Sequence, residues 1–213
     1  MKTISYLLLL ISISISQITI NVNDIQYPEG GSYKMYNIPS PQGVIGLTGI
    51  QQGPHVFDFS NGVITDTVAI EYVNINDGGH GASFQNATIA ERKSTDNNFV
   101  WMYLDFNENA GRTNYGFYDE VGVPDSPNVP FNPPIVDFPN NLSYQSYFTG
   151  TTNFDVSTSG TEINIDYEFT GFVDAYGTIV LPNGMGEHNC IQVNYEEQYT
   201  YNFMGTPIQY SYL

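Results

Sequence analysis

Oxygen-bearing side chains alternate along Asp105-Phe106-Asn107-Glu108-Asn109-Ala110-Gly111, and no other stretch is closer to a metal-binding loop. Calcium prefers carboxylate and amide oxygens, which makes Asp105, Asn107 and Asn109 the candidate ligands. An EF-hand loop needs glycine at its sixth position and glutamate at its twelfth, where this chain has Ala110 and Gly116. A hairpin turn accounts for the same residues, so we expect a turn and no cofactor, with calcium as the alternative.

Histidine, cysteine and serine offer no clear reaction centre. His55, His80 and His188 are far apart in the sequence, whereas a zinc site needs three or four converging nitrogen or sulfur ligands. Cys190 stands two residues from His188 on an expected strand, where a buried, unreactive thiol is a simpler interpretation than a nucleophile with its base. The sequence has neither a Gly-x-Ser-x-Gly motif nor a glycine-rich phosphate loop.

Acidic side chains are numerous enough to raise the question of glycan hydrolysis. Paired carboxylates that cleave a glycosidic bond must flank it. The adjacent pairs Glu196-Glu197 and Asp119-Glu120 would point to opposite faces of a strand, so neither pair meets this requirement. We therefore expect no catalytic residues and keep a glycan-active hydrolase as one alternative.

Aromatic side chains indicate ligand binding instead. The chain has 17 tyrosines, 13 phenylalanines and Trp101. In residues 190–203, Glu197 interrupts an apolar face, which places its carboxylate either in a pocket or where the strand turns to solvent. The candidate ligand-face residues are Trp101, Tyr103 and Glu197, although sheet core and cross-strand pairs explain most of the aromatics.

The charge balance excludes several classes of function. The 213 residues include 22 Asp or Glu and 5 Lys or Arg, for a net charge of -17. Such a chain lacks the cations that neutralise nucleic-acid phosphates or adsorb to anionic membranes. It leaves cations, basic partners or neutral sugars as ligands. With 41% hydrophobic and 15% aromatic residues, it has enough apolar side chains for a folded core.

The N-terminus has the pattern of an export signal. Lys2 precedes an apolar run over residues 4–15, which is shorter than the about 20 residues that span a bilayer. Ser14 and Ser16 are small enough for a signal peptidase, so we expect residues 1–16 to be a signal peptide cleaved after Ser16. A membrane anchor is the alternative. After cleavage we expect no membrane span and a single β domain over residues 17–213.

Alternation of apolar and polar residues dominates the remaining chain. From Glu162 to Thr170 every odd position is apolar and every even position polar, which predicts a strand with one buried face and a bend at Gly171. Residues 174–181 and 190–203 are expected to form a hairpin about Pro182-Asn183-Gly184. Further strands are expected at residues 18–23, 56–59, 67–75, 99–106, 113–118 and 206–212.

Residues 121–139 differ because they contain six prolines. Proline cannot donate to a strand ladder, so this segment is expected to be a long crossing loop with at most one edge strand. The predicted fold class is all-β: an antiparallel β-sandwich or strongly curved half-barrel with an aromatic core and one long Pro-rich loop.

Two parts of the sequence resemble a group of secreted proteins. Residues 56–60 with 65–68, and residues 174–184 with 190–193, resemble the N-terminal β-rich region of proteins exported by the bacterial type IX secretion route. Such proteins start with a signal peptide and an Ile-Thr-Ile-like strand, as Gln17-Ile18-Thr19-Ile20 does here. The resemblance implies export in a Gram-negative bacterium and a secreted, extracellular or cell-surface location, and it supplies no catalytic residues.

The same resemblance raises a question about the C-terminus. Proteins of this kind end in a further β domain that acts as the sorting signal, whereas residues 211–213 stop inside an expected strand. A missing C-terminal sorting domain and release without that route are both open.

The expected function is a non-enzymatic, secreted or cell-surface β module for adhesion or ligand binding, with an extracellular glycan or surface protein as partner. An extracytoplasmic carrier that holds a lipid or other apolar ligand in a cleft of the curved sheet is the first alternative. A closed, packed core would favour the module and an open apolar cleft the carrier. Two carboxylates about 5–10 Å apart across a groove would favour the hydrolase.

Overall fold

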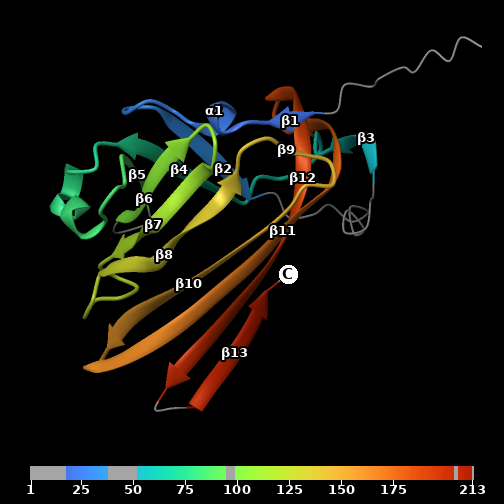
Figure 1. Cartoon of the computed structure of the whole chain (residues 1–213). Coiled ribbons are helices and arrows are strands. Elements are labelled where there is room, and N and C mark those ends of the chain that lie inside the picture. Colours follow the sequence, from blue (N-terminus) through green and yellow to red (C-terminus); the bar gives the residue numbers. More distant parts are fainter. Residues whose placement is uncertain (1–17, 38–51, 95–98, 204–205, 213) are drawn as a thin grey trace, which may run out of the picture.

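The computed structural model describes residues 18–37, 52–94, 99–203 and 206–212, and the expected signal peptide lies outside them (Figure 1). These residues form thirteen strands: β1 (Thr19–Ile20), β2 (Ser32–Asn37), β3 (Gln52–Asp58), β4 (Asp66–Val73), β5 (Ile89–Ser94), β6 (Phe99–Asn107), β7 (Gly111–Asp119), β8 (Asn128–Pro139), β9 (Leu142–Ser143), β10 (Tyr147–Thr158), β11 (Thr161–Leu181), β12 (Gly186–Phe203) and β13 (Thr206–Tyr212). Helical structure in the described ranges is confined to α1 (Val22–Ile25) and two 3₁₀ turns, η1 (Asp77–Gly79) and η2 (Gly81–Ser83).

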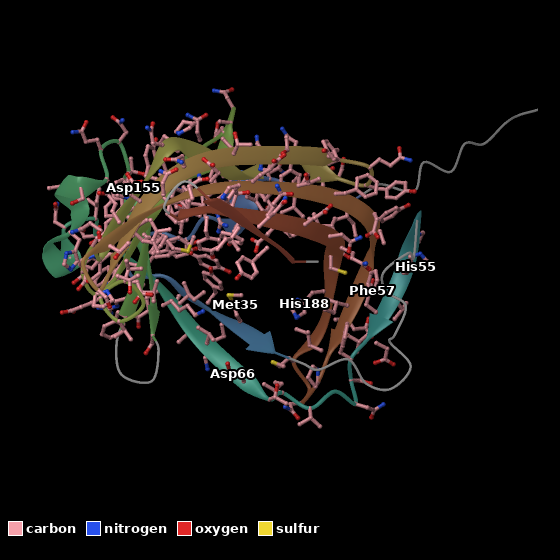
Figure 2. All side chains as sticks on the ribbon, turned by 90° about the horizontal axis from the view of Figure 1, so that it is seen from below. Met35, His55, Phe57, Asp66, Asp155 and His188 are labelled. Carbon is pink, nitrogen blue, oxygen red and sulfur yellow. The ribbon has the colours of Figure 1, made fainter. Side chains whose placement is uncertain are left out.

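One sheet contains nearly all of the strands. Its order is β13-β12-β11-β10-β8-β7-β6-β5-β4-β2, with every neighbouring pair antiparallel, and β3 joins β11 in parallel. The sheet curls without closing into a barrel, and the long strands β10–β13 extend beyond the β2–β8 part (Figure 1). Seen from below, Met35 of β2 and His188 of β12 both project into the space between the two arms of the curl (Figure 2). The predicted all-β fold with an aromatic core is confirmed.

Strand β11 has the two faces that its sequence predicts. Ile165 and Phe169 are buried, whereas Asp166 and Glu168 are exposed. The buried residues belong to two core clusters on the inner side of the curl, one around Leu142 and Phe148 and the other around Val129 and Phe154. The alternation along this strand therefore fixes which side of the sheet forms the core.

The hairpin of β11 and β12 turns at Pro182–Met185, as predicted. Asn183 and Gly184 have φ of 56° and 73°, which asparagine and glycine tolerate better than other residues. The bend was expected at Gly171 but lies about three residues later, because the pairing shifts between Val173 and Ala175. Gly171 has another role: a Cβ there would lie 2.2 Å from the ring of Phe148, so only glycine leaves room for this ring.

The Pro-rich segment corrects the prediction of a crossing loop. Residues 128–139 form strand β8, which lies between β7 and β10 in the sheet. It pairs with β7 at seven positions but with β10 only through Asn132 and Asn153. Prolines lack the N–H that a second ladder would require, so β8 is an inner strand that is paired mainly on its β7 side, in a ladder interrupted by two register shifts.

Two other expectations change in the fold. The strand expected at residues 18–23 is split into β1, paired with β9, and helix α1. Strands β3 and β4 follow one another around Asn61-Gly62, but they pair with β11 and β2 respectively and not with each other. Strands β2, β5 and β10 were not expected from the sequence pattern.

Candidate functional site

A cleft of about 610 Å³ occupies the concave face of the sheet. Side chains of β6, β7, β8, β10, β11 and β12 line it. In a flat sheet, β6 and β12 would be five strand spacings apart, about 24 Å at 4.8 Å per spacing. One cleft touches both strands because the sheet curls around it, so the cleft is a direct consequence of the half-barrel shape.

Aromatic rings form most of the cleft wall. Phe117, Phe131 and Phe154 contact one another with ring centroids 5.3–6.1 Å apart. The rings of Tyr167 and Tyr199 are 4.8 Å apart on the neighbouring strands β11 and β12 and pack against the same core cluster as these phenylalanines. These distances are typical of favourable aromatic pairs, and together the rings give an apolar surface suited to an organic ligand.

An ion-pair network borders the cleft. Arg112 of β7 donates two hydrogen bonds to Asp137 of β8, from Nε at 2.8 Å and from Nη2 at 3.2 Å. Its Nη1 lies 3.6 Å from Oε1 of Glu91, which is only 4% exposed. Burial lowers the pKa of Arg112, but the charges of Asp137 and Glu91 outweigh this effect and raise it overall. The guanidinium therefore stays charged and is already neutralised by protein carboxylates.

Two tyrosines complete the surroundings of Glu91. Tyr72 and Tyr33 donate hydrogen bonds to Glu91 Oε1 at 2.7 and 3.0 Å. Burial, and then the charge of Glu91, raises the pKa of both phenols, so they remain neutral donors. Tyr33, Tyr72 and Arg112 also line a second cavity of about 280 Å³. Arg112 thus lies between the two cavities, because it lines both.

Glu197 of β12 is another acidic group that lines the cleft. Its Oε1 accepts a 2.9 Å hydrogen bond from the hydroxyl of Tyr167. Burial is the largest cause of the raised pKa of Tyr167, followed by this hydrogen bond. Among the residues that the structure describes, no lysine, arginine or histidine forms an ion pair with Glu197.

The remaining polar groups of the cleft serve local structure. Asp119 Oδ1 accepts hydrogen bonds from the backbone N–H groups of Val121 and Gly122, which close the turn after β7. Asn114 is buried, and its Oδ1 accepts the N–H of Gly116 at 2.9 Å. These bonds satisfy both side chains without a ligand.

The three candidate ligand-face residues do not come together. Glu197 lines the cleft, whereas Trp101 and Tyr103 belong to a core cluster with Phe84, Ala87 and other residues on the other face of β6. Tyr103 stacks on Phe84 with ring centroids 4.0 Å apart, and burial raises the pKa of Tyr103 to about 12. Val100 and Met102, which alternate with these residues, face the cleft instead.

The calcium candidates lie in the hairpin that joins β6 and β7. Asp105 Oδ1 accepts a 2.8 Å hydrogen bond from the hydroxyl of Thr88. Asn107 Oδ1 accepts the backbone N–H groups of Asn109 and Ala110 and thereby holds the turn, as expected for these residue types. Within the described part of the chain, no three His, Cys, Asp or Glu side chains are grouped closely enough to hold a metal ion.

The histidines and the cysteine are dispersed over the fold. His80 stacks on Tyr118 with ring centroids 3.4 Å apart. A ring nitrogen of His188 lies 3.0 Å from the carbonyl oxygen of Met185, in the turn between β11 and β12. Burial raises the pKa of the Cys190 thiol, which favours the unreactive, protonated form.

Comparisons with known proteins do not assign the cleft. No protein-family model, curated protein or solved structure matches the chain. Over the residues that the structure covers, no helix has the length and apolar character to cross a bilayer. The residues that line the cleft are therefore the evidence for what it binds.

Proposed function

We propose that this protein is a secreted, non-enzymatic β module that binds an organic ligand with an apolar body in the concave cleft. The cleft itself carries this proposal. Its volume of about 610 Å³ lies within the usual range for small-molecule sites, about 300–1,000 Å³. Aromatic side chains line it, with a few polar groups held in defined positions. This combination supports the carrier alternative within the expected ligand-binding module.

The hydrolase alternative has less support from the same residues. Asp137 is held by two hydrogen bonds from Arg112, and Asp119 by two backbone N–H groups. Neither carboxylate is arranged to exchange a proton with a sugar oxygen, as glycoside hydrolysis requires. Adhesion through the outer surface would leave the aromatic cleft without a role.

Binding can be measured with an apolar fluorescent probe such as N-phenyl-1-naphthylamine. We expect saturable binding with one probe per chain. Met102 lines the cleft. Met102→Trp should fill part of the cleft and weaken binding at least about tenfold, because the probe can no longer contact the aromatic side chains. Val121→Trp, at an exposed position after β7, is the matched control and should bind like the wild type. The absence of saturable binding, or equal binding by Met102→Trp in a folded protein, would refute the proposal.

Export is a separate part of the proposal. The Lys2 start, the apolar run over residues 4–15 and the resemblance to type IX secretion cargo support passage across the inner membrane of a Gram-negative bacterium. Expression of the full chain in such a host, followed by intact-mass measurement of the periplasmic and medium fractions, tests it. The expected mass is that of a chain that begins at Gln17. Retention of residues 1–16 would contradict the predicted cleavage.

A further inference from the structure

Glu197 differs from the other acidic side chains of the cleft in how its charge is compensated. Asp137 is paired with Arg112, and Asp119 accepts two backbone N–H groups. Glu197 is partly buried and receives a hydrogen bond from the neutral hydroxyl of Tyr167. Within the described chain it has no cationic partner, so a carboxylate in an apolar site is left with a net negative charge.

Aromatic rings surround this carboxylate on the concave face. Glu197 lies opposite Phe169 on β11, and Tyr195 and Tyr199 are its nearest neighbours on the same face of β12. Phe169 and Tyr195 have ring centroids 6.3 Å apart, and Tyr167 and Phe169 have centroids 6.0 Å apart. The face of an aromatic ring attracts a cation, and a nearby carboxylate strengthens the attraction.

The side chains that line the cleft have a net negative charge, like Glu197 itself. Among the described residues that line the cleft are three carboxylates and one guanidinium, and the guanidinium is already bound by Asp137. An anionic ligand would have to compete with Asp137 for Arg112 and would be repelled by Glu197. A metal ion would find only one free carboxylate, which is fewer ligands than calcium or zinc requires.

We propose that the ligand is an amphipathic organic cation, a protonated amine or quaternary ammonium on an apolar body. Its head group binds between Glu197 and the rings of Tyr167, Tyr195 and Tyr199. Its apolar body extends over Phe117, Phe131 and Phe154 toward β7 and β8. This inference rests on the proposed ligand-binding function and adds the charge of the ligand to it.

Isothermal titration with three ten-carbon probes tests the inference, each kept below its aggregation limit: decyltrimethylammonium, decanoate and decanol. The wild type should bind decyltrimethylammonium at least about tenfold more tightly than either of the other probes. Glu197→Gln should remove most of this preference, because it removes the charge that favours the ammonium probe over decanol. Glu196→Gln is the matched control, because Glu196 is the exposed neighbour on the other face of β12 and should keep the preference.

The outcomes separate this inference from the proposed function. If decanol binds in the cleft but the ammonium probe has no advantage, or if Glu197→Gln keeps the advantage, the cationic ligand is wrong and the apolar site stands. If none of the three probes binds to the folded wild type, both proposals fail. Circular dichroism of Glu197→Gln confirms folding, and Glu197→Asp should retain part of the preference because the charge is kept.

Discussion

The hydroxyl of Tyr167 on β11 reaches diagonally to Glu197 on the neighbouring strand β12, 2.9 Å away, although the register places Tyr167 opposite Tyr199. Diagonal neighbours on one face of a sheet are within reach of long side chains. The contact fixes one oxygen of Glu197 and leaves the phenol protonated. The same arrangement of phenol and carboxylate occurs on the other side of Arg112, where Tyr33 and Tyr72 bind Glu91.

These tyrosines predict loss of stability in alkali. Burial raises the pKa of Tyr33, Tyr72 and Tyr167 above the value of about 10 that they have in the unfolded chain. Their contribution is fully present below pH 10. Above it the unfolded chain loses protons that the folded chain keeps, so the free energy of unfolding falls.

Denaturant titrations at pH 8, 10 and 11, with tyrosinate absorbance recorded in parallel, check this prediction. We expect a lower free energy of unfolding at pH 11 than at pH 8, and a shallower fall in Tyr72→Phe, which has one less buried phenol. Equal stability of the wild type at pH 8 and pH 11 would contradict the assignment.

Arg112 should be far more important for stability than the half-buried Arg92. Arg112→Met removes the partner of Asp137 and Glu91 and leaves their charges uncompensated, which should cost about 3–5 kcal/mol. Arg92 forms an ion pair with the exposed Glu71 and its guanidinium lies 4.8 Å from the ring centroid of Phe99, so Arg92→Met should cost about 0.5–2 kcal/mol. Urea unfolding of the two variants gives both values. Similar costs for the two variants would show that the ion pairs of Arg112 contribute no more to stability than the contacts of Arg92.

The phase of strand β11 can be tested by two substitutions three residues apart. Ile165 is 5% exposed and packs with Val129 and Phe154, so Ile165→Ala should lower the free energy of unfolding by about 2–5 kcal/mol. Glu162 is exposed on the same strand, and Glu162→Ala should change stability by less than about 0.5 kcal/mol. Equal effects in thermal or urea melts would be inconsistent with the observed faces.

Calcium should stabilise the protein only by screening its net charge of -17. Asp105 and Asn107 already have partners in Thr88 and the turn backbone, so the hairpin offers no assembled set of calcium ligands. Melting temperatures in millimolar calcium and in sodium chloride of equal ionic strength should agree. A larger shift with calcium that Asp105→Ala abolishes would identify a metal loop.

The sequence predicted the parts of the fold that depend on local pattern. Alternation from Glu162 to Thr170 gave the buried face of β11, and Pro182-Asn183-Gly184 gave its turn, because both signals act between near neighbours. The prolines of β8 misled the prediction, since a strand can be internal while being paired mainly on one side. The parallel pairing of β3 with β11 depends on contacts over more than a hundred residues, which no local pattern reports.

The site was predictable only in part for the same reason. Glu197 was visible as a carboxylate on an otherwise apolar strand face. Arg112 and Asp137 come from the paired strands β7 and β8, and Glu91 comes from β5, two strands from β7, so their contacts depend on strand order that no local pattern reports. One signal was available in β7. Arg112 stands two residues before the buried Asn114, so its side chain lies on the same face of the strand.

Strands β8 and β10 pair at a single position, so the sheet consists of two well-paired parts joined by one backbone bridge. Strands β2 and β4–β8 form one hydrogen-bonded leaf, and β3 with β10–β13 forms another. Between the leaves, the rings of Phe131 and Phe154 are in contact beneath the cleft. Outside this bridge, the N–H of Ser157 on β10 donates to Ser126 Oγ before β8. The cleft therefore lies over the part of the sheet with the fewest backbone pairs, where the packing of aromatic rings that a ligand would touch also holds the two leaves together.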